Sequence, residues 1–289
     1  MMKKLLILSG KGGTGKTTTA CAFIKFSNAQ AIADCDVDAP NLHIVADTKG
    51  CGTSSPFYGS EKSCIDEDKC TGCKKCLNSC RFGAISEKDG KCFINEFACE
   101  GCSVCEAVCP VGAVSLKTDQ AGTLTLFKDE KTFSTAKLKM GRGNSGKLVT
   151  EVKNAMSRNA LQAELAIIDG SPGIGCPVIA SVTGVTMVLI VAEPSISGLS
   201  DLKRILKTAG ILDVPVAVCV NKFDISPSIS DEIIRLCHDE GIPFTGKIPY
   251  DKTASEAINQ GKSLADFSCN ARDALFNVYQ NTIEILQNI

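Results

Sequence analysis

The sequence has few aromatic residues and no excess of either charge. Tryptophan is absent, 5% of the 289 positions are Phe, Trp or Tyr, and 31 Lys and Arg stand against 32 Asp and Glu. Proteins bind nucleic acids through basic surfaces and through aromatic side chains that stack on the bases. We therefore expect no nucleic-acid partner.

Long apolar runs are also missing. The chain begins MMKKLLILSGKGG, where a run of four apolar residues precedes the glycines, and no run reaches the roughly 18 residues of a membrane span. The C-terminal segment 271–288 has the pattern of an amphipathic helix with one basic residue, Arg272. We expect it to pack on the protein, because membrane-surface helices carry a basic face. These features predict a cytoplasmic protein with no membrane partner.

Cysteine, in contrast, is abundant, with 17 residues. In a reducing compartment, clustered cysteines more often hold metal than form disulfides. Two stretches, 70–85 and 99–114, share the pattern C-x2-C-x2-C-x3-C and repeat each other at an offset of 29 residues, from Cys70 to Cys99. The repeat predicts a metal-binding insert.

The spacing is that of bacterial two-cluster ferredoxins, in which the fourth cysteine of each run binds the other run's [4Fe–4S] cluster. We predict that the first cluster is held by Cys70, Cys73, Cys76 and Cys109. The second would be held by Cys99, Cys102, Cys105 and Cys80. Zinc and disulfides are the alternatives, and zinc fits poorly because structural zinc uses two separated cysteine pairs around one ion.

Outside the repeats, apolar runs alternate with helical patterns. Runs typical of buried parallel strands lie at 3–9, 30–36, 164–170, 185–195 and 214–222. Helical spacing follows at 197–209 and 228–240, and segment 120–139 is typical of two strands with a charged turn. We predict an α/β fold with a doubly wound, mostly parallel sheet formed by residues 1–60 and 118–289. Residues 61–117 would be the inserted ferredoxin-like 2[4Fe–4S] domain.

A glycine-rich loop follows the first predicted strand. Residues 10–17, GKGGTGKT, match the P-loop motif G-x4-G-K-[ST] between a strand and a helix. The glycines let backbone N–H groups face phosphate oxygens, Lys16 pairs with the β- and γ-phosphates, and Thr17 binds Mg²⁺. We expect this loop to bind nucleotide through Gly10, Lys11, Gly12, Gly13, Thr14, Gly15, Lys16, Thr17 and Thr18.

Three features together resemble one family: Lys11 within the loop, DCDVDAPN at 34–41 and DGSPGIG at 169–175. The chain resembles the deviant Walker A ATPases, the class of MinD, ParA, the Mrp-type scaffolds and the nitrogenase iron protein. Within that class it is similar to MinD-superfamily ATPases that carry an inserted ferredoxin domain.

The resemblance implies roles for individual residues. Lys11 would reach the phosphates of a partner subunit across a nucleotide-sandwich dimer, and Asp36 would position the attacking water. Asp169 would bind Mg²⁺, and the Gly173 N–H would face the γ-phosphate.

We expect the base of the nucleotide to contact NKFD, residues 221–224, and IPYD, residues 248–251. By resemblance, Asn221 would contact adenine and Pro249 would lie in a second loop against the base. Because NKFD also matches the N-K-x-D motif of GTPases, in which the aspartate reads guanine, GTP stays open as an alternative to ATP.

Cys176 follows Asp169 by seven positions in the sequence. In the nitrogenase iron protein, a cysteine at this spacing binds a cluster that bridges two subunits. That protein uses a second cysteine per subunit, for which Cys51 and Cys64 are weak candidates here. We interpret Cys176 first as a buried or capping thiol, with metal binding as the hypothesis to test. Cys21, Cys35, Cys219 and Cys237 lie in apolar patterns and are expected in the core.

Together these features predict a slow, partner-stimulated ATPase that uses Mg²⁺ and two [4Fe–4S] clusters. It would form a homodimer or a heterodimer with a paralogue, and would couple closure of that dimer to electron transfer or metal-centre maturation in an unidentified redox or metalloprotein partner. The alternatives are a MinD/ParA-like positioning ATPase with structural clusters and a GTP-dependent metallochaperone.

Overall fold

The computed structural model describes residues 2–44 and 52–289. The chain divides into two compact units. Unit 1 comprises Met1–Ser54, Leu124–Lys137 and Ser145–Ile289, and unit 2 comprises Ser55–Thr123 and Leu138–Asn144. Each unit is described by itself below.

The main sheet has nine strands among the described residues. In spatial order they are β13 (Phe244–Ile248), β12 (Val216–Asn221), β11 (Met187–Ala192), β1 (Lys3–Leu8), β10 (Leu165–Asp169), β2 (Ala31–Asp34), β9 (Thr132–Leu138), β8 (Gln120–Lys128) and β3 (Thr53–Tyr58). The pairs from β13 to β9 are all parallel. The prediction of a mostly parallel α/β sheet is confirmed, and the carboxyl ends of β1, β2, β10 and β12 meet at one edge, where ligands bind in such sheets.

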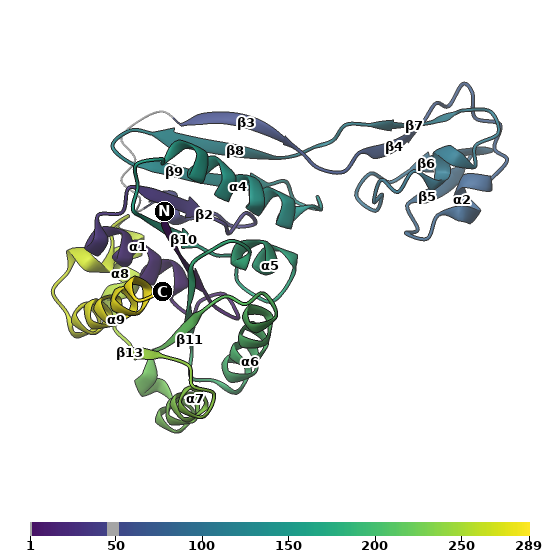
Figure 1. Cartoon of the computed structure of the whole chain (residues 1–289). Coiled ribbons are helices and arrows are strands. Elements are labelled where there is room, and N and C mark those ends of the chain that lie inside the picture. Colours follow the sequence, from purple (N-terminus) through teal and green to yellow (C-terminus); the bar gives the residue numbers. More distant parts are fainter. Residues whose placement is uncertain (1, 45–51) are drawn as a thin grey trace. The chain divides into compact units, whose positions relative to one another are not determined.

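Helices cover both faces of this sheet (Figure 1), with α1, α8 and α9 on one face and α4, α5 and α6 on the other. The helices of unit 1 are α1 (Lys16–Ser27), α4 (Ser145–Asn159), α5 (Cys176–Val182), α6 (Ile196–Ile211), α7 (Pro227–Asp239), α8 (Lys252–Asn259) and α9 (Asn270–Gln287). Short 3₁₀ turns lie at Leu42–Ile44, Phe223–Ile225 and Leu264–Asp266.

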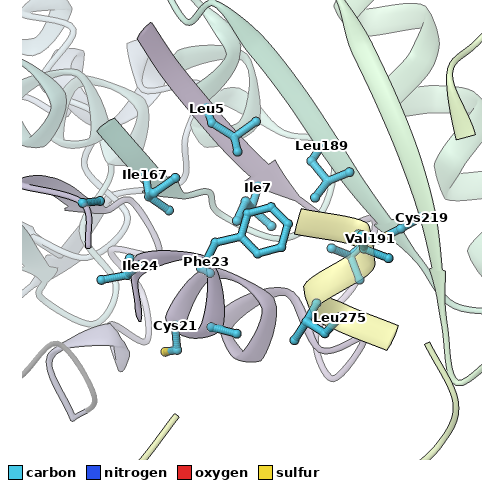
Figure 2. Close-up of a cluster of buried hydrophobic side chains, with 14 of the residues drawn as sticks. Leu5, Ile7, Cys21, Phe23, Ile24, Ile167, Leu189, Val191, Cys219 and Leu275 are labelled. Carbon is cyan, nitrogen blue, oxygen red and sulfur yellow. The ribbon is translucent and has the colours of Figure 1, made fainter. Parts of the chain in front are cut away.

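The core of unit 1 forms where α1 packs on the sheet. The Phe23 ring of α1 lies among Leu5 and Ile7 of β1, Leu189 of β11 and Leu275 of α9 (Figure 2), and all are almost completely buried. Residues Leu275, Val278 and Leu286 of α9 belong to this core, which confirms that the C-terminal helix packs on the protein. None of the helices among residues 2–44 and 52–289 is long and apolar enough to span a membrane.

The structure extends the predicted elements at the edges of the sheet. The segments expected at 120–139 form β8 and β9, as predicted, and β9 pairs with β2 of the main sheet. Strand β13, strand β3 and helix α8 are elements that the sequence analysis did not propose. Edge strands such as β13, with the sequence FTGKI, need few apolar residues and leave a weak periodic signal.

Unit 2 contains two copies of one short motif. Its elements are β4 (Lys62–Ile65), α2 (Lys75–Ser79), β5 (Ile85–Lys88), β6 (Lys91–Ile94), α3 (Val104–Ala107) and β7 (Val114–Lys117). The copies exchange strands, because β4 of the first pairs antiparallel with β7 of the second, and β5 of the first pairs with β6 of the second. The two copies therefore depend on each other for their strand pairing.

Candidate functional site

The glycine-rich loop connects β1 to α1 at the carboxyl edge of the sheet. Gly13 has φ of 80° and Gly15 has φ of 93°, a region that side chains with a Cβ rarely adopt. A Cβ at Gly15 would also collide with the Nδ2 atom of Asn221, at the end of β12. Glycine at this position therefore allows both the turn and the close approach of the loop to β12.

The loop borders a cavity of about 370 Å³ in unit 1. Every predicted loop residue from Lys11 to Thr18 lines it, together with Asp36, Asn221 and Pro249. Gly10 and Gly173 are not among the described residues that line it: Gly10 packs against Asp201, and the Gly173 N–H donates to the Ser9 carbonyl over 3.2 Å.

One polar atom in this cavity is left unpaired within the chain. Thr14 is buried, and its Oγ1 has no hydrogen-bond partner among the described residues. Buried hydroxyls are normally paired, so Thr14 is an exception within this loop.

Lys16 and Asp169 form a buried ion pair beneath the loop. The Lys16 Nζ lies 2.6 Å from Asp169 Oδ1, and Thr17 Oγ1 donates to Asp169 Oδ2 over 2.7 Å. Burial alone would lower the pKa of Lys16, but the carboxylate of Asp169 raises it. The residues expected to bind phosphate and Mg²⁺ are thus in direct contact with one another.

Asp34 is a second buried carboxylate, opposite Asp169 in the register of β2 and β10. It accepts the N–H groups of Asp36, Asn41 and Leu42 over 3.0–3.1 Å and so fixes the loop that follows β2. Burial and the nearby Asp169 raise the pKa of Asp34 to about 7. Burial also raises the pKa of Asp36, which lines the cavity.

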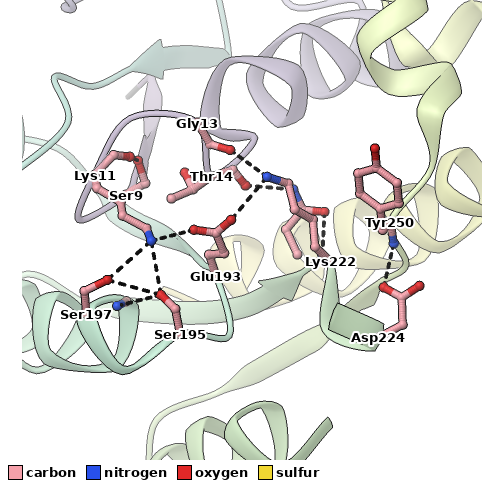
Figure 3. A network of polar contacts seen from close by, with 12 residues as sticks. Ser9, Lys11, Gly13, Thr14, Glu193, Ser195, Ser197, Lys222, Asp224 and Tyr250 are labelled. Carbon is pink, nitrogen blue, oxygen red and sulfur yellow. Dashed lines mark hydrogen bonds and ion pairs between the residues drawn. The ribbon is translucent and has the colours of Figure 1, made fainter. Parts of the chain in front are cut away.

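Lys11 is paired within its own chain. Its Nζ lies 2.7 Å from Glu193 Oε2, just after β11, and 3.1 Å from the hydroxyl of Ser195 (Figure 3). Lys222 pairs with Oε1 of the same glutamate over 3.2 Å and donates to the Gly13 carbonyl over 2.8 Å. Burial would raise the pKa of Glu193, but the two lysines lower it.

The sequence analysis did not propose Glu193 or Lys222 as site residues. The sequence held part of the information needed to propose Glu193, because this charged residue comes directly after the buried strand β11, at the edge where ligands bind.

The predicted base-binding residues lie on two neighbouring loops. The Asn221 Nδ2 donates to the Thr14 carbonyl over 2.7 Å, so this amide braces the phosphate loop. Asp224 Oδ1 accepts the Tyr250 N–H over 2.8 Å and joins the NKFD loop to the IPYD loop (Figure 3). Asp224 is not among the described residues that line the cavity, whereas Pro249 and Tyr250 are.

The repeat cysteines surround two small cavities in unit 2. One is lined by Cys70, Cys73, Cys76 and Cys109, together with a further cysteine, Cys92. The other is lined by Cys99, Cys102, Cys105 and Cys80. Each cavity thus brings together three cysteines of one repeat and the fourth cysteine of the other.

Backbone N–H groups face two of these sulfurs. The Ala113 N–H donates to Cys109 Sγ over 3.2 Å. For Cys109 and Cys99, burial would raise the pKa, but N–H donors around each sulfur lower it. Within the part of the chain that the structure describes, no group of three or more His, Cys, Asp or Glu is arranged to hold a single metal ion.

Comparison with known proteins shows which family carries this phosphate loop. The sequence pattern of the CobQ/CobB/MinD/ParA nucleotide binding domain matches residues 5–264, which include the loop, Asp36, Asp169 and Asn221. The chain belongs to the CobQ/CobB/MinD/ParA family. Two relatives are uncharacterized proteins of Methanocaldococcus jannaschii. One is 33% identical over 99% of this chain and 98% of its own length; the other is 31% identical over 92% and 93%.

Solved structures of the family share the fold. The septum site-determining protein MinD of Pyrococcus horikoshii, complexed with Mg-ADP, covers 99% of this chain and 97% of its own, with 17% identity and a TM-score of 0.57. Apo McdA of Cyanothece matches with the same identity and TM-score over 98% and 100%. A ParA family ATPase of Chlorobium tepidum matches at 15% identity and TM-score 0.52 over 96% and 98%.

The remaining cysteines have varied positions. Cys21, Cys35, Cys219 and Cys237 are buried, as predicted. The expectation that Cys176 is buried or capping is wrong: it is exposed at the first residue of α5, whose N-cap is Gly175. A helix start leaves room for a thiol beside its unpaired N–H groups. The metal-binding hypothesis for Cys176 stays a prediction; Cys51, one weak candidate for its companion, lies outside the described residues.

Proposed function

We propose that the chain binds and hydrolyses Mg·ATP in the cavity of unit 1 and carries two [4Fe–4S] clusters in unit 2. ATP-driven dimer closure would be coupled to electron transfer to a partner, or to maturation of the partner's metal centre. The observation that carries this proposal is the grouping of the eight repeat cysteines into two sets of four, each around its own cavity in a chain of a nucleotide-binding family.

The contacts of Lys16 and Asp169 support ATP hydrolysis, because Mg·ATP would give both residues new partners. Nucleotide phosphates would draw Lys16 away from Asp169, and the released carboxylate would join the Thr17 hydroxyl at Mg²⁺. The loop N–H groups, Gly173 and Lys11 would neutralise phosphate charge, and Asp36 would orient the attacking water. Because phosphoryl transfer depends mainly on position and charge, these groups suffice for slow hydrolysis.

The cysteine sites fit iron–sulfur clusters in their donor set. Thiolate is the ligand that [4Fe–4S] clusters take, and N–H groups that face the sulfurs stabilise the charged form. The loops between the cysteines turn at Gly72 and Gly101, both with φ of 67°. When bound, the clusters would supply one-electron transfer at potentials set by these surroundings.

The test is made on the full chain, reconstituted anaerobically with iron and sulfide. Two clusters require about eight iron atoms per chain. We expect this content, and a cluster potential or spectrum that changes on addition of Mg·ATP but not Mg·ADP. Absence of iron would refute the cluster proposal, and an unchanged potential and spectrum would refute the coupling.

A second candidate is a positioning ATPase whose clusters are structural. The names of the solved relatives support it better than they support a redox role, because they include a septum site-determining protein and a ParA family ATPase. It predicts ATP-dependent binding to membranes or DNA. Co-sedimentation with anionic vesicles and with duplex DNA separates the two candidates, since clear ATP-dependent binding would favour positioning.

The third alternative, a GTP-dependent metallochaperone, rests on the NKFD sequence. Asp224 would have to face guanine, whereas its Oδ1 is bonded to the Tyr250 N–H and the residue lies outside the cavity lining in the described structure. We therefore favour ATP. Competition between ATP and GTP for a fluorescent ATP analogue is the check, and equal displacement by GTP would reverse this choice.

A further inference from the structure

The internal repeat of unit 2 extends beyond the two cysteine runs. At the same offset of 29 residues, Lys74 and Ser103 both have positive φ, and so do Gly83 and Gly112. The hydrogen bonds repeat too: Asp66 N–H to the Ala113 carbonyl corresponds to Asn95 N–H to the Ala84 carbonyl. A Cβ at Gly72 would collide with the Gly90 carbonyl, as one at Gly101 would with the Glu61 carbonyl. The equivalence therefore includes the strands that precede the runs.

Strand β4 corresponds to β6 in this extended repeat. Their sequences are KSCI and KCFI, so Ser63 and Cys92 occupy equivalent positions. Both side chains are buried, with 5% of Ser63 and 1% of Cys92 exposed. The two cysteine cavities are thus alike in backbone, and one difference in their lining is a buried thiol in the first and a buried hydroxyl in the second.

Each of these residues contacts the third cysteine of its site. Ser63 accepts a hydrogen bond from Cys105 Sγ over 3.2 Å in the second site. In the first site, Cys92 and Cys76 belong to one cluster of buried side chains and line the same cavity. Cys92 also lines the cavity beside the four predicted ligands. The first site therefore holds five thiols, whereas the second holds four thiols and a hydroxyl.

We propose that Cys92 is a reserve ligand of the first cluster site, which takes the place of Cys76 when that thiol is lost. This inference rests on the proposed function, since it requires clusters in unit 2. A thiol next to the ligand reaches the same iron by a small side-chain adjustment, because it already faces the same cavity. A serine hydroxyl in the equivalent place is a poor substitute, since iron–sulfur clusters are held by thiolates.

Cys64 does not share this position. It is not among the described residues that line either cysteine cavity, its Sγ lies 3.2 Å from the Ser115 hydroxyl, and its counterpart in the second copy is Phe93. Cys92 is therefore the cysteine outside the two runs, among the described residues, that lines a predicted cluster cavity.

The pseudo-symmetry supplies a matched set of variants for the test. Iron and sulfide are measured per chain after anaerobic reconstitution, with electron paramagnetic resonance in the oxidised and reduced states. Cys76→Ala should keep about eight iron atoms, whereas Cys76→Ala/Cys92→Ala should fall to about four. Cys105→Ala, which has only Ser63 beside it, should also fall to about four. Adding Ser63→Cys to Cys105→Ala should restore about eight.

Failure of the inference is distinguishable from failure of the proposed function. Wild-type protein without iron would refute the clusters themselves. Wild-type protein with about eight iron atoms, and Cys76→Ala with four or with the signal of a three-iron cluster, would refute the reserve role alone. Binding of a fluorescent ATP analogue shows that unit 1 of each variant is folded, and limited proteolysis compares the folding of unit 2 between the variants.

Discussion

Lys11, Lys16 and Asp169 show how single residues of the phosphate site are held before nucleotide arrives. Each lysine has a carboxylate partner within the chain, Glu193 for Lys11 and Asp169 for Lys16. A buried charge without a partner is costly, so Lys16 and Asp169 stabilise each other, whereas the pair of Lys11 and Glu193 is partly exposed. Nucleotide phosphates would replace the carboxylates as partners of the lysines.

Replacing Lys11 with alanine tests its proposed action on a second subunit. Lys16 and the loop N–H groups remain, so nucleotide binding should change little, whereas ATP hydrolysis should fall about 10³-fold if the charge acts in the dimer's transition state. The measurements are phosphate release and light scattering with Mg·ATP. Lys207→Ala, which removes an exposed lysine from α6, is the control and should behave as wild type.

Asp34 predicts a dependence of stability on pH. Its pKa of about 7 in the folded chain exceeds the value of about 3.9 in an unfolded chain. The folded state therefore binds more protons between these values, and its stability falls as pH rises from about 4 to 7. Asp34→Asn removes this titration. The loss of stability between about pH 4 and pH 7 should therefore be smaller in this variant than in wild type by a few kcal/mol.

Urea unfolding followed by circular dichroism at pH 5 and 7.5 measures that slope without nucleotide. The variant loses acceptors for the loop N–H groups, so it should be less stable than wild type at pH 5, with the difference shrinking by pH 7.5. Asp38→Asn, at an exposed position, should keep the wild-type slope. Equal slopes for Asp34→Asn and wild type would contradict the assignment.

At the scale of elements, α4 and α5 are joined by one buried side chain. Lys153 of α4 donates from Nζ to the carbonyls of Ala180, Ser181 and Thr183, at the end of α5, over 2.5–2.8 Å. These carbonyls belong to the group that a helix leaves unpaired at its C-terminus. Burial lowers the pKa of Lys153 to about 8, so the amine is still mostly charged at neutral pH.

Lys153→Met should therefore destabilise unit 1 by about 3 kcal/mol, because it leaves buried carbonyls without a donor. Chemical denaturation at pH 7 measures the effect. Arg158→Met, at an exposed position on the same helix, should change stability by no more than about 0.5 kcal/mol. Similar losses of stability in both variants would mean that the hydrogen bonds from Lys153 to these carbonyls make no contribution of their own.

At the scale of the whole molecule, the boundaries between the units lie within β3 after Ser54, within β8 after Thr123 and within β9 after Lys137, and the fourth lies just before α4. Unit 1 holds its own sheet and core, whereas unit 2 has short strands and a small core that consists largely of cysteines. A core this small needs additional stabilisation, such as that from a bound metal centre. The units should therefore differ in their dependence on iron.

Cys73→Ser tests that difference. It should halve the iron content to about four atoms per chain and make unit 2 sensitive to protease, while ATP binding by unit 1 stays within about twofold. Cys102→Ser is the equivalent change in the second site and should give the same result. Loss of ATP binding in both variants, or full iron content in either, would contradict this division.

Much of the fold was predictable from sequence, because its main elements have local signals. Buried parallel strands leave continuous apolar runs, and the phosphate loop has a fixed spacing between a strand and a helix. The 29-residue repeat is equally local. These patterns predicted the mostly parallel sheet and most of its strands, and they selected some of the residues that line the cavity of unit 1. The edge strand β13 has a weak pattern and was missed, and so was α8, an amphipathic helix of eight residues.

Only the tertiary structure decided which side chains from distant segments of the chain contact one another. Glu193 holds Lys11 across 182 positions of the chain, and no local pattern pairs two such residues. Asn221 braces the Thr14 carbonyl from the neighbouring loop, and Cys92 joins the first cysteine cavity only because β6 folds back over it. The sequence alone indicated the family and the elements that have strong local patterns, since periodicity and loop spacing act along the chain. Side-chain pairing acts through space, and therefore only the folded chain decided it.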